Sequence, residues 1–309
     1  MLRTAVRRIA SHDVKKYPRV MIATSLVSIA VVMPMAAQST LTGAQVVDRI
    51  SQHAAVTLPN PTVDTFKSGD PSAPVHRIAV TMMATLDVLK RAAANGDNFI
   101  ITHEPTFYSH SDTLAILESE NDAVLAAKRK FIADHGLIIW RFHDTPHRMK
   151  PEIITKGVIH ALGWESRQHG LTGQLFDLPP TTLGALASTV SKRLGANATR
   201  IIGDPNARVS KVGLTEGFPG FVANRHVFQS YDLDVLVIGE DHEWEMIEYA
   251  KDAIEEGKLK GMIVVGHIAS EQAGMEEVTR WLKTFITEVP IDFVPTREPF
   301  RPRARDSSL

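Results

Sequence analysis

The chain has 309 residues, of which 44% are hydrophobic and 22% charged, which excludes large-scale disorder and allows one or two folded domains. The formal net charge is −1, but the first 37 residues hold six Lys or Arg and one Asp, which leaves 28 basic and 34 acidic residues in the rest of the chain. This acidic body argues against nucleic acid as a partner, and the absence of cysteine excludes disulfides, thiolate metal ligands and cysteine nucleophiles.

Residues 1–37 have the features of a secretory signal peptide. A basic stretch precedes an apolar run from Val20 to Met33, and the small residues Ala36 and Ala37 follow it. The apolar run is short for a membrane span. We therefore expect cleavage near Ala37, export to the periplasm or the cell exterior, and no stable membrane insertion afterwards. An uncleaved anchor and an organelle transit sequence are the alternatives.

Residues 38–169 predict an N-terminal lobe in which strands alternate with helices. A segment rich in Pro, Thr, Ser and Gly at 57–74 reads as a loop. The expected helices are 41–54, 86–95, 121–135 and 152–162, and the expected strands are 75–81, 98–102 and 137–142. This alternation favours a largely parallel sheet with helices on its faces.

Residues 170–296 continue in the same style and predict a C-terminal lobe, followed by a flexible tail at 297–309. The expected helices are 182–194, 241–256 and 271–288, and the expected strands are 171–176, 199–202, 209–214, 234–238, 262–265 and 291–294. The chain as a whole is thus expected to be an α/β protein with mixed, largely parallel sheets.

Three predicted strands end in side chains that commonly bind metals, and ligands in open α/β sheets bind beyond the carboxyl ends of the strands. The first strand ends at His103 and Glu104, where Pro105 prevents its simple continuation. Adjacent strand residues point to opposite faces, so both side chains can serve one site only if the strand bends. His110 and Asp112 follow in the loop and could also reach the site.

The second strand end carries His143, Asp144 and His147 within five residues. Imidazole and carboxylate together suit Zn²⁺, Fe²⁺ or Mn²⁺. A surface turn in which Asp144 binds local backbone groups is the alternative.

The third strand end carries His267 and, four residues later, Glu271, which share one face if the chain becomes helical there. The alternative is a helix that Ser270 caps. A fourth strand end adds Glu240 and His242 as candidates, although a capped helix start is the favoured interpretation of that segment. Residues 213–220 are glycine-rich and could approach a ligand, although a plain turn is the favoured interpretation.

At these residues the sequence resembles the Nif-three-like dinuclear-metal family, whose members are often labelled GTP cyclohydrolase 1 type 2 homologues. Residues 98–105 resemble the family's strand ending in Thr-His-His-Pro, and residues 266–271 resemble its Gly-His-x-x-x-Glu. The resemblance runs from about Leu41 to Pro299. It implies a toroidal homohexamer of two-lobed subunits with the metal site in the cleft between the lobes.

The resemblance also implies a ligand set in which His103 and His267 bind metal and Glu271 can bridge two ions. Two positions depart from the family pattern, because Glu104 stands where the family has His and His147 stands where it has Asp. One change gains a carboxylate and the other loses one, so the exchange can be compensated. Asp144 as the ligand, or a single metal ion, are the alternatives.

The expected function is metal-dependent hydrolysis of an unidentified small molecule. One or two divalent ions (Zn, Fe or Mn) would lower the pKa of a water, with Glu271 bridging and His143 or Glu240 moving the proton. GTP is disfavoured, because an exported protein meets little of it and no basic phosphate cradle is evident. A metal-buffering module without turnover and a hexameric scaffold are the alternatives.

Overall fold

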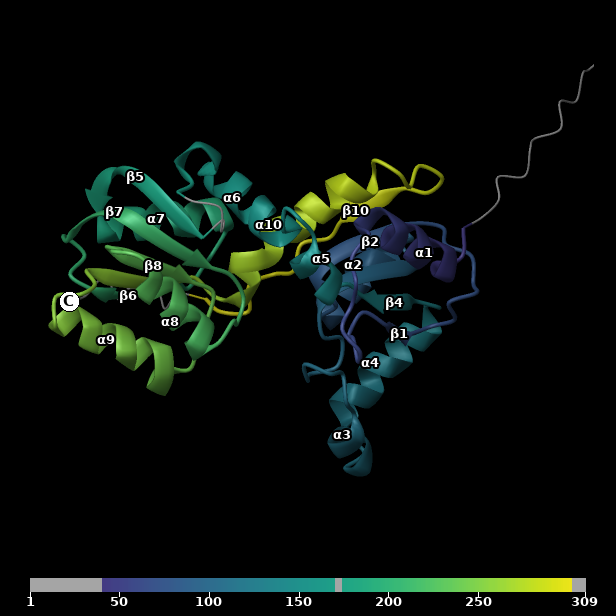
Figure 1. Cartoon of the computed structure of the whole chain (residues 1–309). Helices are drawn as coiled ribbons and strands as arrows, with labels where there is room; N and C mark the ends of the chain where they lie inside the picture. The colour runs from purple at the N-terminus through teal and green to yellow at the C-terminus, as the bar shows by residue number, and fades with distance from the viewer. Residues whose placement is uncertain (1–40, 170–173, 302–309) are drawn as a thin grey trace, which may run out of the picture. The chain divides into compact units, whose positions relative to one another are not determined.

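The computed structural model describes residues 41–169 and 174–301. The predicted signal at 1–37, the start of the predicted strand 171–176 and the end of the predicted tail lie outside the described residues. Two five-stranded mixed sheets carry helices on their faces (Figure 1), which confirms the expected α/β class. Within the described ranges, no helix is long and apolar enough to cross a membrane.

The first sheet has the strand order β1-β4-β3-β2-β10. Its strands are β1 (Phe66–Ser68), β2 (Ile78–Met83), β3 (Phe99–Glu104), β4 (Ile138–Arg141) and β10 (Ile291–Phe293). All pairs are parallel except β1 with β4. Every residue of β3 is buried, because both faces of the sheet are covered.

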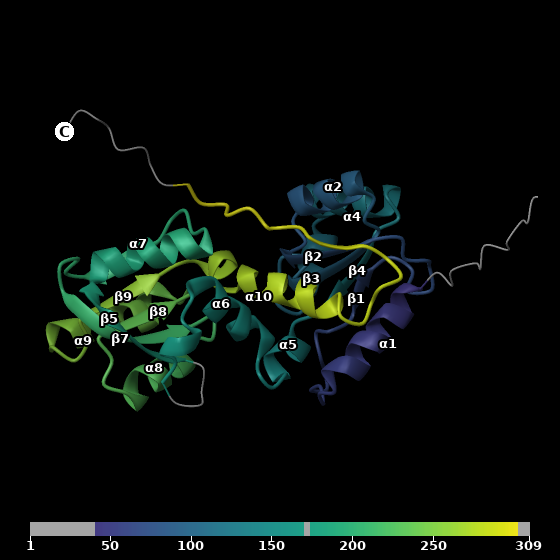
Figure 2. The ribbon, with the colours of Figure 1, turned by 90° about the horizontal axis from the view of Figure 1, so that it is seen from above.

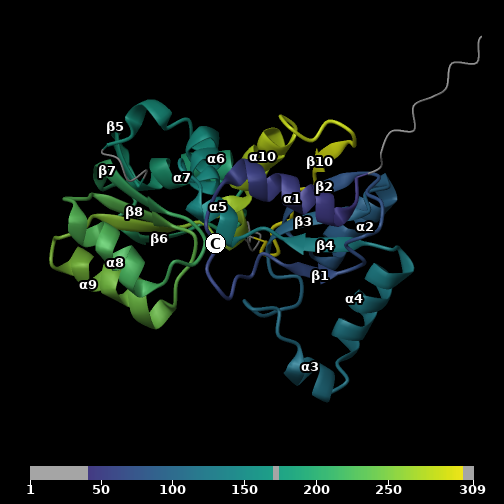
Figure 3. The ribbon, with the colours of Figure 1, turned by 45° about the vertical axis from the view of Figure 1, so that its right-hand side comes forward.

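Helices cover both faces of this sheet. These helices are α1 (Gly43–Ala54), α2 (Leu86–Asn95), α3 (Ala115–Ser119), α4 (Ala123–Asp134) and α10 (His267–Leu282), and the short helix α5 (Asp144–Arg148) follows β4. Ile78 and Val80 of β2 pack with α1 and α10, whereas Ala79 packs with α2 and α4 on the other face. Figure 3 shows α1 lying alongside the strands of this sheet.

The second sheet has the order β5-β7-β8-β9-β6, with parallel central strands and antiparallel edges. Its strands are β5 (Leu175–Thr182), β6 (Arg200–Gly203), β7 (Arg208–Thr215), β8 (Val235–Ile238) and β9 (Gly261–Val264). Helices α6 (Ile153–Leu162) and α7 (Leu183–Leu194) pack on one face, and α8 (Phe221–Ser230) and α9 (Glu248–Glu255) on the other. The predicted helix 241–256 is in fact a π-helical turn, Glu243–Ile247, followed by α9.

Helix α10 connects the two sheets through its packing against α6, and the two helices run side by side in Figures 1 and 2. A side chain is impossible at the point of closest approach, since a Cβ on Gly157 would lie 2.5 Å from the Ala273 carbonyl oxygen. A Cβ on Gly274 would equally lie 2.5 Å from the Ile154 Cα. These two glycines therefore set the position of α10, which carries part of the site described below.

The last strand differs from the expected assignment. The sequence grouped residues 291–294 with the C-terminal lobe, whereas Ile291 of β10 pairs with Ile78 of β2 in the first sheet. The reason is that Met275, Val278 and Leu282 of α10 pack in the apolar cluster of the first sheet, which brings the following chain back to it. The other lobe boundaries stay a prediction.

Candidate metal centre

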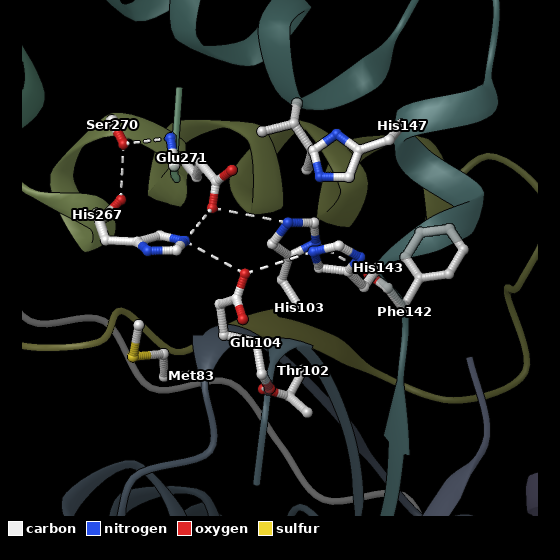
Figure 4. A network of polar contacts seen from close by, with 12 residues as sticks. Met83, Thr102, His103, Glu104, Phe142, His143, His147, His267, Ser270 and Glu271 are labelled. Carbon is white, nitrogen blue, oxygen red and sulfur yellow. Dashed lines mark hydrogen bonds and ion pairs between the residues drawn. The ribbon is translucent and has the colours of Figure 1, made fainter. Parts of the chain in front are cut away.

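Side chains from all three predicted strand ends meet at one place (Figure 4). The Nε2 atom of His267 lies 3.1 Å from Oε2 of Glu271 and 3.3 Å from Oε1 of Glu104. The Nε2 of His103 lies 3.7 Å from the same Glu271 oxygen. The Nε2 of His143 lies 3.6 Å from Oε1 of Glu104. Five residues from three separate segments of the sequence thus form one cluster.

Both His103 and Glu104 reach this cluster, although they are adjacent at the end of β3. His103 is fully buried, and its Nδ1 lies 3.0 Å from the Phe142 carbonyl oxygen. A carbonyl only accepts hydrogen bonds, so Nδ1 carries the proton and Nε2 presents a lone pair to the cluster. Glu104 is held by the buried guanidinium of Arg141, whose Nη2 lies 3.3 Å from Glu104 Oε2.

His267 and Glu271 lie on the first two turns of α10, which confirms that they share one helix face. The helix begins four residues earlier than expected, with Gly266 rather than Ser270 at its N-cap. Ser270 instead accepts a hydrogen bond from the backbone N–H of Gly217 at 2.9 Å.

Glu240 holds the outer nitrogen of His267, because its Oε1 lies 2.9 Å from Nδ1. From the sequence, Glu240 was expected to move a proton in the reaction. The geometry instead makes it a positioning residue, since it directs Nε2 of His267 toward Glu104 and Glu271.

Replacing Glu240 by alanine is expected to weaken divalent-metal binding about tenfold, because losing such a partner typically costs about 10–100-fold in affinity. Competition against a chromogenic chelator measures the affinity. Glu165→Ala is the matched control, since Glu165 makes the same contact with the exposed His160, at 2.7 Å. Equal affinities for the two variants would show that Glu240 does not position His267.

The second strand end forms the short helix α5. The rings of His143 and His147 lie 4.7 and 5.0 Å from that of His103. Ligand atoms of these three histidines lie within 4.8 Å of one another, as do those of two further groups: Glu104, His110 and His143, and His103, Glu104 and Glu271. His147 is directed by Glu152, whose Oε1 lies 3.1 Å from its Nδ1.

Asp144, the alternative ligand, belongs to none of these groups within the part of the chain that the structure describes. Its Oδ2 accepts hydrogen bonds from the Thr62 hydroxyl at 2.7 Å and from the Val63 N–H at 3.1 Å. Its Oδ1 lies 3.3 Å from Nδ1 of His143. Asp144 therefore orients His143, and the geometry favours His147 over Asp144 as the ligand.

Sequence reasoning missed four charged residues that shape the site. Asp64 accepts four hydrogen bonds from residues 143–145, and Arg141 binds the backbone of residues 103 and 110. Glu152 caps α6, and Glu216 lies in the glycine-rich segment 213–220. Of these four residues, only Glu216 lies in a segment that the sequence analysis had singled out as able to approach a ligand. No sequence spacing connects Asp64, Arg141 or Glu152 with the candidate ligands.

The glycine-rich segment approaches the cluster closely. Gly217 has a φ of +59°, and a Cβ there would lie 2.3 Å from Oε1 of Glu271. The segment was expected to be a plain turn, but its backbone lies against the carboxylate, and only glycine leaves enough room.

The imidazoles and carboxylates of the cluster shift one another's pKa values. Burial would raise the pKa of Glu104, but the neighbouring imidazoles of His267, His103 and His143 outweigh it and hold that pKa well below its usual range. Burial would likewise lower the pKa of His267, but the neighbouring carboxylates of Glu104, Glu240 and Glu271 raise it to about 12. Burial and the Glu152 carboxylate raise the pKa of Glu216 to about 7.

Three buried ligand atoms in the cluster have no hydrogen-bond partner among the described residues: His103 Nε2, His267 Nε2 and Glu271 Oε2. Buried polar atoms are normally paired, so this convergence indicates a missing partner. Imidazole nitrogens and carboxylate oxygens suit a divalent transition metal. The residues therefore fit one or two metal ions, which His103, Glu104 and Glu271 would bind together with His143, His147 and His267 beside them.

A cavity of about 820 Å³ opens beside the cluster, which is a usual size for a small-molecule site. Six of the clustered side chains line it: Glu104, His143, His147, Glu240, His267 and Glu271. The candidate ligands are thus accessible to a small substrate.

A family model described as Duf34/NIF3 (NGG1p interacting factor 3) matches residues 63–299. The chain belongs to the Duf34/NIF3 family. This match includes every candidate ligand and confirms the resemblance that residues 98–105 and 266–271 had indicated. No curated protein matches the sequence significantly.

Solved structures share the fold of this Duf34/NIF3 protein. Staphylococcus aureus hypothetical protein SA1388 superposes with a TM-score of 0.65 at 15% identity, covering 85% of this chain and 100% of that one. A Bacillus cereus protein related to NIF3 superposes with a TM-score of 0.65 at 14% identity, covering 84% of this chain and 99% of that one. Reduced HcgD from Methanocaldococcus jannaschii superposes with a TM-score of 0.53 at 14% identity, covering 82% of this chain and 98% of that one. At these identities the similarity concerns the fold.

Proposed function

We propose that this chain is a divalent-metal-dependent hydrolase that holds one or two ions of Zn, Fe or Mn and acts on a small molecule. The observation that carries the proposal is the convergence of three buried ligand atoms, His103 Nε2, His267 Nε2 and Glu271 Oε2. None of them has a hydrogen-bond partner within residues 41–169 and 174–301, and they lie beside an open cavity. We place this cavity in the cleft between two lobes, one built around each sheet.

When bound, a divalent ion lowers the pKa of a coordinated water and polarises the bond to be cleaved. The chain's own residues fix the geometry of the site. The Phe142 carbonyl and Glu240 accept hydrogen bonds from Nδ1 of His103 and His267, which leaves both Nε2 atoms as ligands. Glu271 of α10 lies beside the Nε2 atoms of both His103 and His267. We therefore assign it the role of the carboxylate that would bridge two ions.

Proton transfer needs a group that is not committed to another contact. Glu240 is committed to His267, and His143 stands among the candidate ligands. Glu216 lines the cavity, and no residue of the described chain hydrogen-bonds its Oε1. We therefore assign proton transfer to Glu216 Oε1 in place of Glu240.

Elemental analysis of the untagged protein tests the metal part of this proposal. About two transition-metal ions per chain would support a dinuclear site, and one would support a mononuclear site. No bound metal, even after incubation with Zn, Fe and Mn salts, would overturn it.

Hydrolysis is tested on a panel of esters, amides and phosphoesters with the same preparations. We expect turnover that disappears on chelation and returns with the metal. Stoichiometric metal without turnover on any member of the panel would favour the metal-buffering alternative.

We further propose export, on the signal-like pattern of residues 1–37, and assembly into a homohexamer, which the family resemblance implies. N-terminal sequencing of the protein from the cell envelope would give a start near residue 38, and sedimentation would give six chains per particle. An intact N-terminus in the cytosol or a monomer would contradict these proposals.

A further inference from the structure

The cavity contains a second charged feature, the buried lysine Lys128 on α4. Lys128 is 3% exposed and lines the same cavity as the candidate ligands. Its Nζ donates a hydrogen bond to the carbonyl oxygen of Thr106 and lies 5.1 Å from the centre of the Tyr108 ring. An ammonium group has three N–H donors, so this single hydrogen bond leaves two available.

Lys128 forms no ion pair with the carboxylates of the described residues. In the described ranges, no carboxylate oxygen lies within 4.0 Å of its Nζ. The nearby Asp112 is already paired, since its Oδ2 lies 3.3 Å from Lys67 Nζ and 3.6 Å from Arg141 Nη1. Burial lowers the pKa of Lys128 to about 8, which reflects this incomplete compensation. A buried charge without a partner is unfavourable for stability and is typical of a binding site.

Two neighbouring residues strengthen this interpretation. Thr106 lines the cavity and is 1% exposed, and its hydroxyl has no hydrogen-bond partner among the residues that the structure describes. Tyr108 also lines the cavity, with a φ of +62° and 58% of its surface exposed. A bulky residue in the left-handed region is strained, and such strain is concentrated at ligand sites.

We propose that Lys128 forms an oxyanion subsite of this cavity, which binds a carboxylate or phosphate group of the substrate while the metal centre acts on another part of it. This inference rests on the proposed function and specifies its substrate class. Lys128 donates a hydrogen bond to Thr106, which follows the candidate ligand Glu104 by two residues, and two residues span at most about 7 Å of chain. The lysine therefore lies close to the metal cluster. We infer that the substrate is a small anion whose charged group and reacting bond both fit in this one cavity.

The test uses inorganic phosphate and acetate as probes on the full chain, both as purified and after metal removal. Binding is measured by ³¹P line broadening and by displacement with acetate. We expect weak phosphate binding to the metal-free protein, and loss of about tenfold or more in affinity in Lys128→Met. Lys130→Met is the control, because Lys130 lies on the same helix with 74% of its side chain exposed and outside the cavity lining. The affinity of Lys130→Met for phosphate should equal that of the unmodified chain.

Acetate that competes at equal concentration would identify a carboxylate subsite, whereas phosphate binding that acetate does not displace would identify a phosphate subsite. Binding in Lys128→Met equal to that in Lys130→Met, or no binding of either probe at tens of millimolar, would overturn the inference. Lys128→Gln replaces Lys128→Met if the latter does not fold. Metal content, measured on the same samples, tests the proposed function separately, because the metal-free arm does not depend on it.

Discussion

Replacing Glu271 by glutamine is expected to weaken divalent-metal binding by on the order of 100-fold or more, because losing only an outer partner of a ligand typically costs 10–100-fold. Glutamine keeps the shape of the side chain but removes the negative charge that faces His103 and His267, at 3.7 and 3.1 Å. Competition with a chromogenic chelator gives the affinity, and hydrolytic turnover should disappear together with the metal.

Glu276→Gln is the matched control for this prediction. Glu276 lies on the same helix with 55% of its side chain exposed, and it pairs with Arg280 at 3.4 Å, away from the cluster. Its substitution should leave the metal affinity unchanged. An affinity of Glu271→Gln equal to that of the control would show that Glu271 is not a ligand and would remove the bridging position from the proposal.

Replacing Asp64 by alanine is expected to destabilise the protein by about 3 kcal/mol, because each buried donor left unsatisfied costs about 1–3 kcal/mol and the effects are not additive. Asp64 Oδ1 accepts hydrogen bonds from the backbone N–H groups of His143 and Asp144, both at 2.7 Å. Its Oδ2 accepts from the N–H and hydroxyl of Thr145 at 2.8 and 2.6 Å. Urea unfolding followed by circular dichroism measures the loss.

Asp70→Ala serves as the comparison, since Asp70 is an exposed carboxylate that accepts from the N–H and hydroxyl of Ser72 at 2.8 and 2.7 Å. Water replaces these hydrogen bonds on mutation, so the expected loss is much smaller than for Asp64→Ala. Asp64→Ala should also weaken metal binding, because α5 carries His147 and begins directly after His143. Similar stability losses in the two variants would mean that Asp64 does not hold the α5 turn in place.

The strand ends show how far local patterns reach. His103 and Glu104 were identified because a buried apolar run stops at metal-binding side chains, and the run itself is visible in the sequence. Whether both residues serve one site was left open, since alternation places neighbours on opposite faces. The structure brings both into the cluster, because Arg141 and the Phe142 carbonyl hold them from the neighbouring strand β4 and the residue that follows it.

The roles within the site depended on contacts that no spacing rule encodes. Glu240 was expected to move a proton and instead orients His267, which α10 carries 27 residues later. Lys128 reads as an ordinary surface residue of a helix, yet it is buried in the cavity wall.

The sequence by itself determined the α/β class, the strand ends that supply the candidate ligands and the family to which they belong. These depend on hydrophobic periodicity and short motifs, which are local properties of the chain. The tertiary structure decided that β10 joins the first sheet, that Asp144 orients His143, and which buried atoms lack partners. These depend on long-range packing, in which Gly157 and Gly274 let α6 and α10 approach and so bring the side chains of both sheets together.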